Sequence, residues 1–274
     1  MGKNSIVQGH QARKRFGQNF LSDNFYIQRI VDSIAPRTED CMVEIGPGLG
    51  AITEHLIKAV GQLNVVELDR DLIPRLQEKF SQYDNFVIHH HDALKFDFTN
   101  LYQNDSDAQG KLRIVGNLPY NISTPLIFHL LDQREVIQDM YFMLQKEVVE
   151  RICAAPGTSQ YGRLSVMAQY YCQTQMLFVV PPGAFLPPPK VDSAIIRLQP
   201  HEQLPYPVTD AKQLNKIVTS AFGQRRKTLR NSLKNWINDV QLQDLGIDPQ
   251  QRAENISLQQ FTQICCFIEQ ESQN

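Results

Sequence analysis

The chain has 274 residues, of which 42 % are hydrophobic and 20 % charged, as is typical of a globular protein with one large domain or a large and a small one. The net charge of −2 gives no sign of a nucleic-acid partner. No stretch approaches the roughly 20 apolar residues of a membrane span, and no apolar core follows the charged N-terminus, so we expect neither a membrane anchor nor a secretory signal. Five cysteines without paired metal-type spacing indicate buried thiols in a reducing, cytoplasmic setting.

Strand-like apolar runs alternate with helical patterns through the first half of the chain. The predicted strands are Cys41–Gly46, Leu63–Leu68, Phe86–His89, Leu112–Gly116 and Asp139–Leu144. Helical spacing of apolar residues marks Gly50–Val60 and Arg70–Phe80, and Thr124-Pro125 opens another helix. This alternation predicts the α/β class, with a doubly wound, mainly parallel sheet.

The pattern changes in the second half of the chain. Two further strands, Gln175–Val180 and Ser193–Leu198, flank a Pro-rich connection that is too short for a helical crossover, which predicts an antiparallel pair at the sheet edge. Beyond Pro200 the periodic segments are helical, namely Ala211–Phe222, Lys227–Ile237 and Leu258–Ile268. We therefore expect a large α/β domain over residues 1–200 and a small all-helical domain over 201–274.

Positive charge is concentrated in two segments that contain no acidic residue. Residues 1–22 include Lys3, Arg13, Lys14 and Arg15, and residues 221–236 include Arg225, Arg226, Lys227, Arg230 and Lys234. A solvated helix face would explain one such cluster. Two clusters with interleaved aromatic residues favour a focused anionic partner such as nucleic acid.

Glycines and acidic residues follow the predicted strands in a pattern typical of nucleotide binding. Glu44-Ile45-Gly46-Pro47-Gly48-Leu49-Gly50 ends the first strand, and its glycines let a ligand approach backbone N–H groups. Glu67 closes the second strand, where a carboxylate can accept both ribose hydroxyls, and Asp92 follows the third, where it can accept the adenine amino group. The carboxyl ends of parallel strands share one edge, so these residues converge. The pattern favours S-adenosylmethionine over a nicotinamide cofactor, which Glu67 alone also permits.

Asn117-Leu118-Pro119-Tyr120 follows the fourth strand. An Asn oxygen and a backbone carbonyl can accept the two N–H bonds of an exocyclic amino group, and Tyr120 can stack on the ring that carries it. A plain strand-exit turn is the alternative, because Asn, Pro and Tyr are common there. The consecutive residues His89, His90 and His91 point to alternate faces of a strand, so we predict no metal site.

A series of motifs in order carries a family resemblance. The series contains Gly17-Gln18-Asn19-Phe20-Leu21, the glycine motif, Glu67-Leu68-Asp69, His91-Asp92-Ala93, Gly116-Asn117-Leu118-Pro119-Tyr120, Gln145-Lys146-Glu147-Val148, Tyr161-Gly162-Arg163-Leu164-Ser165, Phe185-Leu186-Pro187-Pro188-Pro189-Lys190-Val191-Asp192-Ser193 and Phe222-Gly223-Gln224-Arg225-Arg226-Lys227. With this series the chain resembles the ribosomal RNA adenine N6,N6-dimethyltransferases, the kasugamycin-sensitivity family of bacteria and its relatives. The resemblance covers about residues 10 to 235.

The resemblance implies a role for individual residues. Asn19 and Leu21 would close over S-adenosylmethionine, and the methionine part of this ligand would lie against Gly46. Glu67 would bind the ribose, and Asp92 would bind the adenine amino group. Asn117 would sit where cofactor and target meet, and Tyr120 and Phe185 would sandwich the flipped target adenine. Leu118, where similar amino-DNA methylases often have Pro, would leave room for a second methylation. Arg13, Lys14, Arg15, Arg225, Arg226, Lys227 and Arg230 would hold RNA phosphates.

The resemblance also implies the substrate and the partners. The family dimethylates two adjacent adenines in a hairpin loop near the 3′ end of 16S rRNA, within an assembling small ribosomal subunit. We therefore expect a cytoplasmic, monomeric RNA methyltransferase with no metal, no DNA substrate and no membrane partner. Three alternatives remain open from the sequence: an assembly checkpoint or binding factor with dispensable catalysis, a DNA adenine methylase, and a nicotinamide oxidoreductase.

Overall fold

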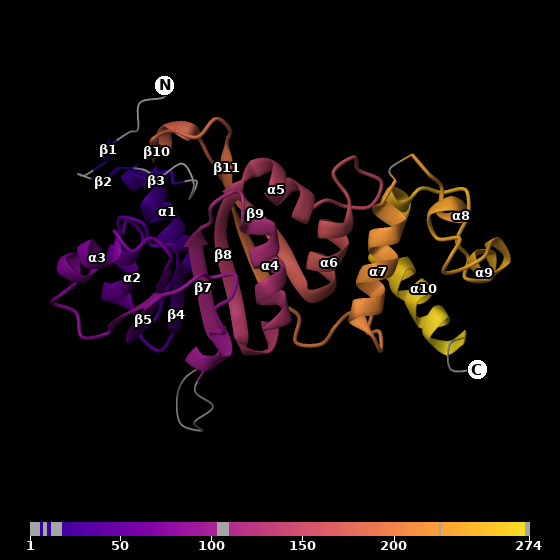
Figure 1. Cartoon of the computed structure of the whole chain (residues 1–274), viewed down its shortest axis with the longest axis horizontal. Helices are drawn as coiled ribbons and strands as arrows, with labels where there is room; N and C mark the ends of the chain where they lie inside the picture. The colour runs from indigo at the N-terminus through magenta and orange to yellow at the C-terminus, as the bar shows by residue number, and fades with distance from the viewer. Residues whose placement is uncertain (1–5, 8–9, 12–17, 103–109, 225, 272–274) are drawn as a thin grey trace. The chain divides into compact units, whose positions relative to one another are not determined.

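The structure is a computed structural model that describes residues 6–7, 10–11, 18–102, 110–224 and 226–271 (Figure 1). The chain divides into two compact units. The first contains the chain up to Val149 together with Gln175–Pro200, and the second contains Glu150–Thr174 together with the chain from His201 onward. One division between the units falls after Pro200, and the assignment of residues 1–200 and 201–274 to two domains stays a prediction. Residues 150–174, which we expected in the first domain, belong to the second unit because their helix contacts helices of that unit.

A seven-stranded sheet forms the centre of the first unit, in the order β6-β5-β4-β7-β8-β11-β9. Its strands are β4 (Cys41–Ile45), β5 (Gln62–Glu67), β6 (Phe86–His90), β7 (Leu112–Asn117), β8 (Ile137–Gln145), β9 (Cys172–Val180) and β11 (Ser193–Pro200). The strands from β6 to β8 in this order pair in parallel, whereas β11 runs antiparallel to β8. The prediction of a mainly parallel, doubly wound sheet is confirmed.

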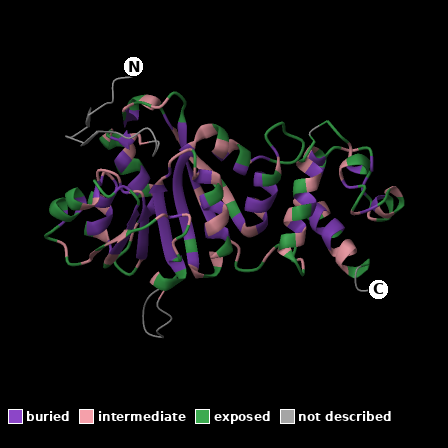
Figure 2. Cartoon of the chain, viewed as in Figure 1, coloured by how far each residue is buried: buried purple, intermediate pink, exposed green. Residues whose placement is uncertain are grey.

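Burial explains why the central strands are continuous apolar runs in the sequence. β4 is buried along its whole length, and Figure 2 shows the sheet strands largely in the colour of buried residues. Strands of a parallel sheet that is covered on both faces are apolar at consecutive positions rather than at alternate ones. The five strands from β4 to β8 each lie within two residues of their predicted bounds, because Gly, Asn and charged residues mark where burial ends.

Three helices connect parallel strands of the first unit: α2 (Thr53–Ala59), α3 (Ile73–Lys79) and α4 (Ser123–Asp132). α1 (Asn24–Ile34) precedes the main sheet, and α5 (Lys146–Ile152) follows β8 and continues into the second unit. Short 3-10 turns lie at Phe98–Leu101, Arg134–Val136 and Pro182–Ala184. The side chain of Asp23 accepts a hydrogen bond from the Phe25 backbone N–H and so caps the start of α1. One face of α1 is apolar and buried, with Ile27, Ile30 and Ile34 in the core.

Two short ribbons lie outside the main sheet. β1 (Ile6–Val7) pairs with β2 (His10–Gln11), and β3 (Phe20–Leu21) pairs with β10 (Phe185–Leu186). In the second ribbon Leu21 lies opposite Phe185, and Phe20 lies opposite Leu186. Residues far apart in the sequence are thereby held next to each other beside the first helix.

The second unit is helical. It contains α6 (Arg163–Tyr171), α7 (Ala211–Phe222), α8 (Leu229–Ser232), α9 (Asp239–Asp244), a 3-10 turn (Ala253–Asn255) and α10 (Leu258–Glu271). α7 contacts both α6 and α10, and its Leu214, Ile217 and Val218 are buried. None of the described helices combines the length and the apolar character that a membrane crossing requires.

The predicted helix Lys227–Ile237 is wrong as one continuous element, since only the four-residue α8 forms there. Backbone N–H groups of this segment bond to a distant loop instead: Leu229 donates to the Gln251 carbonyl at 2.8 Å and Arg230 donates to the Pro249 carbonyl at 3.0 Å. A helical apolar period does not reveal such long-range partners, so the pattern overstated the length of the helix.

Candidate active site

A cavity of about 320 Å³ lies at the carboxyl ends of β4, β5, β6 and β7. Ligands of open α/β sheets bind at this edge, and the volume is at the lower end of the roughly 300–1,000 Å³ that is usual for small-molecule sites. Eight of the residues predicted for the site line it: Asn19, Leu21, Gly46, Glu67, Asp92, Asn117, Leu118 and Tyr120. The predicted convergence of the strand ends therefore occurs in the structure.

The glycine loop forms one wall of this cavity. Gly46, Gly48 and Gly50 have φ values of 66°, 59° and 79°, a left-handed conformation that side chains disfavour. A Cβ atom on Gly50 would also lie 2.8 Å from the Phe80 ring, so both the backbone conformation and the space available require glycine at this position. Gly46 and Gly48 line the cavity, so their backbone has no side chain of its own between it and a ligand.

Glu67 lies at the end of β5 with only 7 % of its surface exposed. Burial raises its pKa to about 7, although hydrogen bonds from the backbone of Asp69, Gly48 and Leu68 favour the ionised form. The Asp69 N–H donates to Glu67 Oε1 at 2.7 Å. This carboxyl is thus held rigidly in the cavity wall and can accept hydrogen bonds from vicinal hydroxyls.

Glu44 is a second buried carboxyl in the cavity wall, and sequence reasoning gave it no role. Its side chain accepts a hydrogen bond of 2.6 Å from the Thr53 hydroxyl at the start of α2. Burial raises its pKa to about 7, and the nearby Glu67 carboxyl adds to this rise. The signal was present in the sequence, since an acid in a continuous apolar strand needs a specific partner.

Asp92 follows β6 and lines the same cavity. One of its oxygens, Oδ1, accepts a hydrogen bond of 3.0 Å from the Leu94 N–H, which fixes the turn. His89 pairs instead with Asn64, whose Oδ1 is 2.9 Å from His89 Nε2. Within the described ranges, no group of three or more His, Cys, Asp or Glu side chains is placed to hold a metal ion.

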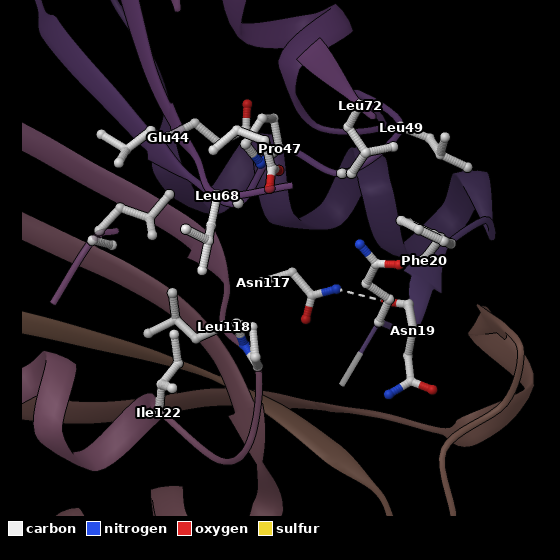
Figure 3. Close-up of a pocket in the computed structure, with 18 of the residues that line it drawn as sticks. Asn19, Phe20, Glu44, Pro47, Leu49, Leu68, Leu72, Asn117, Leu118 and Ile122 are labelled. Atoms are coloured by element: carbon white, nitrogen blue, oxygen red, sulfur yellow. Dashed lines mark hydrogen bonds between the residues drawn. The ribbon is translucent and has the colours of Figure 1, made fainter. Parts of the chain in front are cut away.

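Asn117 occupies the end of β7, and its side-chain Nδ2 donates to the Asn19 carbonyl oxygen at 3.0 Å (Figure 3). Its Oδ1 points away from Asn19. The segment that carries Asn19 is itself fastened, because Gln18 Nε2 donates to Asp69 Oδ2 at 3.0 Å and Asp69 is buried. Gln18 and Asp69 both belong to the motif series, but sequence reasoning assigned neither a role, because their contact joins residues that are distant in the chain.

Leu118 and Tyr120 complete the polar-aromatic turn. The Leu118 N–H donates to the Met143 carbonyl at 3.1 Å, and its side chain lines the cavity although it is almost fully buried. The Tyr120 hydroxyl lies 2.8 Å from Ser193 Oγ. This hydrogen bond anchors the ring at its hydroxyl. Burial raises the pKa of Tyr120, and the hydrogen bond to Ser193 opposes the rise.

Phe185, predicted to face Tyr120 across the target base, is placed elsewhere. It belongs to the hydrophobic core with Leu21, its side chain is only 1 % exposed, and it is not among the residues that line the cavity. In the β3–β10 ribbon Phe185 lies opposite Leu21, and both side chains pack into the hydrophobic core.

The predicted phosphate-binding residues fall into two sets. Arg13, Lys14, Arg15 and Arg225 lie outside the described residues. Arg226, Lys227 and Arg230 are exposed in the second unit, and Arg230 forms an ion pair with Asp239. Exposed cations of this kind are available to an anionic partner.

The sequence matches the family described as Ribosomal RNA adenine dimethylase over residues 9–270. It is 60 % identical over 264 residues to the Ribosomal RNA small subunit methyltransferase A of Marinobacter nauticus, covering 96 % of this chain and 94 % of that protein. A second relative of the same name, from Hahella chejuensis, is 56 % identical over 98 % of this chain and 97 % of its own length.

Solved structures show the same fold. A dimethyladenosine transferase from Plasmodium falciparum superposes with a TM-score of 0.79 at 26 % identity, covering 92 % of this chain and 98 % of that one. The 23S rRNA methyltransferase ErmE superposes with a TM-score of 0.71 at 24 % identity, over 92 % and 100 % of the two chains. The family resemblance expected from the motifs is confirmed. The chain belongs to the ribosomal RNA adenine dimethylase family of S-adenosylmethionine-dependent methyltransferases.

Proposed function

We propose that this protein transfers methyl groups from S-adenosylmethionine to N6 of two adjacent adenines in the 3′-terminal hairpin loop of 16S rRNA. The substrate is the assembling small ribosomal subunit, and the enzyme acts as a monomer in the cytoplasm. One observation carries the proposal: an Asn amide of fixed orientation ends β7 in a cavity whose other strand ends carry a glycine loop and two acids, Glu67 and Asp92.

The residues of this cavity fit S-adenosylmethionine, which supplies an electrophilic sulfonium methyl group when it is bound. Glu67 accepts both ribose hydroxyls, and Asp92 accepts the adenine amino group through the oxygen that does not cap the turn. Gly46 lets the methionine part pass close to the backbone, and Asn19 and Leu21 close the cavity from the N-terminal side. The buried carboxyls also favour a cationic ligand over a pyrophosphate.

Asn117 positions the attacking nitrogen. Adenine N6 is a weak nucleophile because its lone pair is delocalised into the ring. With Nδ2 bonded to Asn19, the Asn117 Oδ1 accepts one N6–H bond, and the Leu118 or Pro119 carbonyl accepts the other. These bonds favour a pyramidal nitrogen with its lone pair directed at the methyl group, so the catalysis consists of positioning and electrostatics. The proton leaves after transfer, and no side chain has to act as the base.

Tyr120 and Leu118 shape the target side of the cavity. The Tyr120 ring, anchored through Ser193, offers a face on which the flipped adenine stacks. Leu118 leaves space for the first methyl group while the second is added. Phe185 supports this region from the core through its pairing with Leu21, rather than as the second stacking face that we expected.

Phosphate contacts complete the proposal. Arg226, Lys227 and Arg230 in the helical unit, together with Arg13, Lys14, Arg15 and Arg225, hold the RNA backbone and so position it without reading its sequence. Unpaired loop adenines require less energy to extrude than stacked ones, which favours a hairpin loop over duplex DNA.

Methyl transfer from labelled S-adenosylmethionine to small subunits that lack the modification tests this function. Naked 16S rRNA and duplex DNA serve as parallel substrates, and the nucleosides are analysed. Dimethyladenosine on the subunits supports the proposal. Tight subunit binding without transfer would instead support the assembly-factor alternative.

A further inference from the structure

A second cavity, of about 780 Å³, lies beside the first and shares part of its wall. The shared residues are Phe20, Leu21, Leu49 and Ala51. The other side of this second cavity is formed by the start of α1, by α2, and by the loop after β10. The two cavities therefore adjoin at β3 and at the glycine loop.

The β3–β10 ribbon gives the second cavity an apolar wall. Phe20 and Leu186 pair across the ribbon and face the cavity, whereas Leu21 and Phe185 pair on the face that joins the core. Leu186 is 49 % exposed, which is unusual for a leucine in a paired strand. Pro187 and Pro188 continue this wall, so a flat apolar ring can lie against it.

Polar side chains form the opposite rim. Asn24 and Gln28 project from the first turns of α1, and His55 projects from α2. Lys79 Nζ lies 3.2 Å from Glu54 Oε2 and 3.3 Å from the Leu49 carbonyl oxygen. Glu54 and Lys79 both line the cavity, so the rim presents an ion pair with the lysine ammonium group at the cavity.

We propose that this second cavity receives the base of an unpaired nucleotide adjacent to the target adenine in the RNA. The apolar wall suits the face of a base, the amide and imidazole groups suit its edge, and the ammonium group of Lys79 suits its phosphate. The shared wall at Phe20 and Leu21 places this base one side chain away from the methyl-transfer site. The inference deepens the proposed function and rests on it.

The experiment combines a protein variant whose side chain fills the second cavity with RNA that lacks the base next to the target adenine. Gln28→Trp places a large ring in the cavity from an exposed helix position, and Gln77→Trp is the matched control on α3, where Gln77 is exposed and lines neither cavity. Both variants and the wild type methylate small subunits whose RNA is intact, or abasic at the nucleotide on the 5′ or the 3′ side of the target. The readouts are kcat/KM for the subunit and the dissociation constant for S-adenosylmethionine.

The proposal predicts that one abasic substitution lowers wild-type kcat/KM about tenfold, as expected for the loss of one stacked base. Gln77→Trp behaves as the wild type does, whereas Gln28→Trp loses this sensitivity and keeps the same affinity for S-adenosylmethionine. Equal activity on intact and abasic subunits, or equal sensitivity in Gln28→Trp and the wild type, would overturn the proposal. A wild type that methylates no intact subunit would overturn the proposed function, and this inference with it.

Discussion

The Nδ2 atom of Asn117 donates a hydrogen bond to the backbone carbonyl of Asn19 across a distance of 3.0 Å. A carbonyl can only accept, so this contact determines which end of the amide meets it and leaves the oxygen directed away. Residues 98 positions apart thereby set the orientation of the amide that, in the proposed mechanism, meets the target amine. Gln18 holds the same segment to Asp69, and both Gln18 and Asn19 line the cavity, so this N-terminal segment forms part of its wall.

Asn117→Asp tests this polarity. Aspartate keeps an oxygen for the amine but replaces the donor by an acceptor that repels the Asn19 carbonyl. We expect kcat to fall about a hundredfold, the scale of a misplaced reacting group, with little change in affinity for S-adenosylmethionine. Single-turnover methylation and calorimetric titration measure the two quantities. Wild-type kcat in the Asp variant would show that the contact with Asn19 has no part in positioning.

The proposed contact of Glu67 with the ribose predicts that cofactor binding depends on pH. Because burial raises its pKa to about 7, the carboxylate that accepts the ribose hydroxyls is mostly absent at pH 6 and mostly present at pH 8. We expect affinity for S-adenosylmethionine to rise by up to about tenfold over this range through this group. Glu67→Gln binds more weakly at pH 8 and loses this part of the slope. Titration of the ligand itself is common to both proteins, so equal slopes in the two would refute the assignment.

The same group affects the stability of the ligand-free protein in the opposite direction. The folded-state pKa of Glu67 lies above its ordinary value of 4.5, so the folded state binds more protons between pH 4.5 and 7 and loses stability as pH rises through this window. Glu67→Gln removes this loss. Thermal unfolding should therefore show a larger advantage of the variant over the wild type at pH 8 than at pH 5; an advantage that does not change with pH would contradict the burial effect.

Substitutions at Phe185 distinguish a role in the hydrophobic core from a role in stacking on the target base. Phe185→Ala removes a ring that is 1 % exposed and should cost about 3–5 kcal/mol of unfolding free energy. Phe185→Leu largely fills the same space and should cost less than about 1.5 kcal/mol, with KM for the subunit close to that of the wild type. Denaturant unfolding and methylation kinetics provide both numbers. A stable Leu variant with a large rise in KM would restore the stacking role that the sequence suggested.

We propose that Leu118 leaves the space for the second methyl group. Leu118→Pro would also delete the N–H that bonds to the Met143 carbonyl, so a change of side-chain size is the cleaner test. Leu118→Phe should raise the ratio of monomethyl to dimethyl product, because the larger ring occupies the cavity. Leu118→Met, with a similar volume, is the matched control. Nucleoside analysis after partial reaction gives the ratio, and an unchanged ratio in the Phe variant would remove Leu118 from this role.

Lys227 should contribute to RNA affinity through a phosphate. Its replacement by Ala should reduce the slope of log affinity against log salt by about one, with no change in sequence preference. Arg230 already forms an ion pair with Asp239, so Arg230→Ala should change the slope less. Filter binding to small subunits at several salt concentrations compares the two; identical slopes for Lys227→Ala and the wild type would exclude the contact.

The sequence sufficed for features set by local pattern. The continuous apolar strands, the glycine loop and the polar ends at Glu67, Asp92 and Asn117 all have short-range signals, and the structure brings these three residues to one cavity. Features that depend on contacts between residues distant in the chain could not be predicted from the sequence. Leu21 against Phe185, Gln18 against Asp69 and the N–H of Leu229 on Gln251 each join segments whose proximity only the folded chain creates.

Transfer of labelled methyl groups to small subunits that lack the modification, by the wild type and by Asn117→Ala in parallel, tests the central claim most directly. The account predicts N6,N6-dimethyladenosine at the two adjacent adenines with the wild type, and a loss of about a hundredfold in rate with the variant, while both proteins bind S-adenosylmethionine with similar affinity. Equal rates for the two proteins, or methylation at another atom or in another nucleic acid, would contradict it.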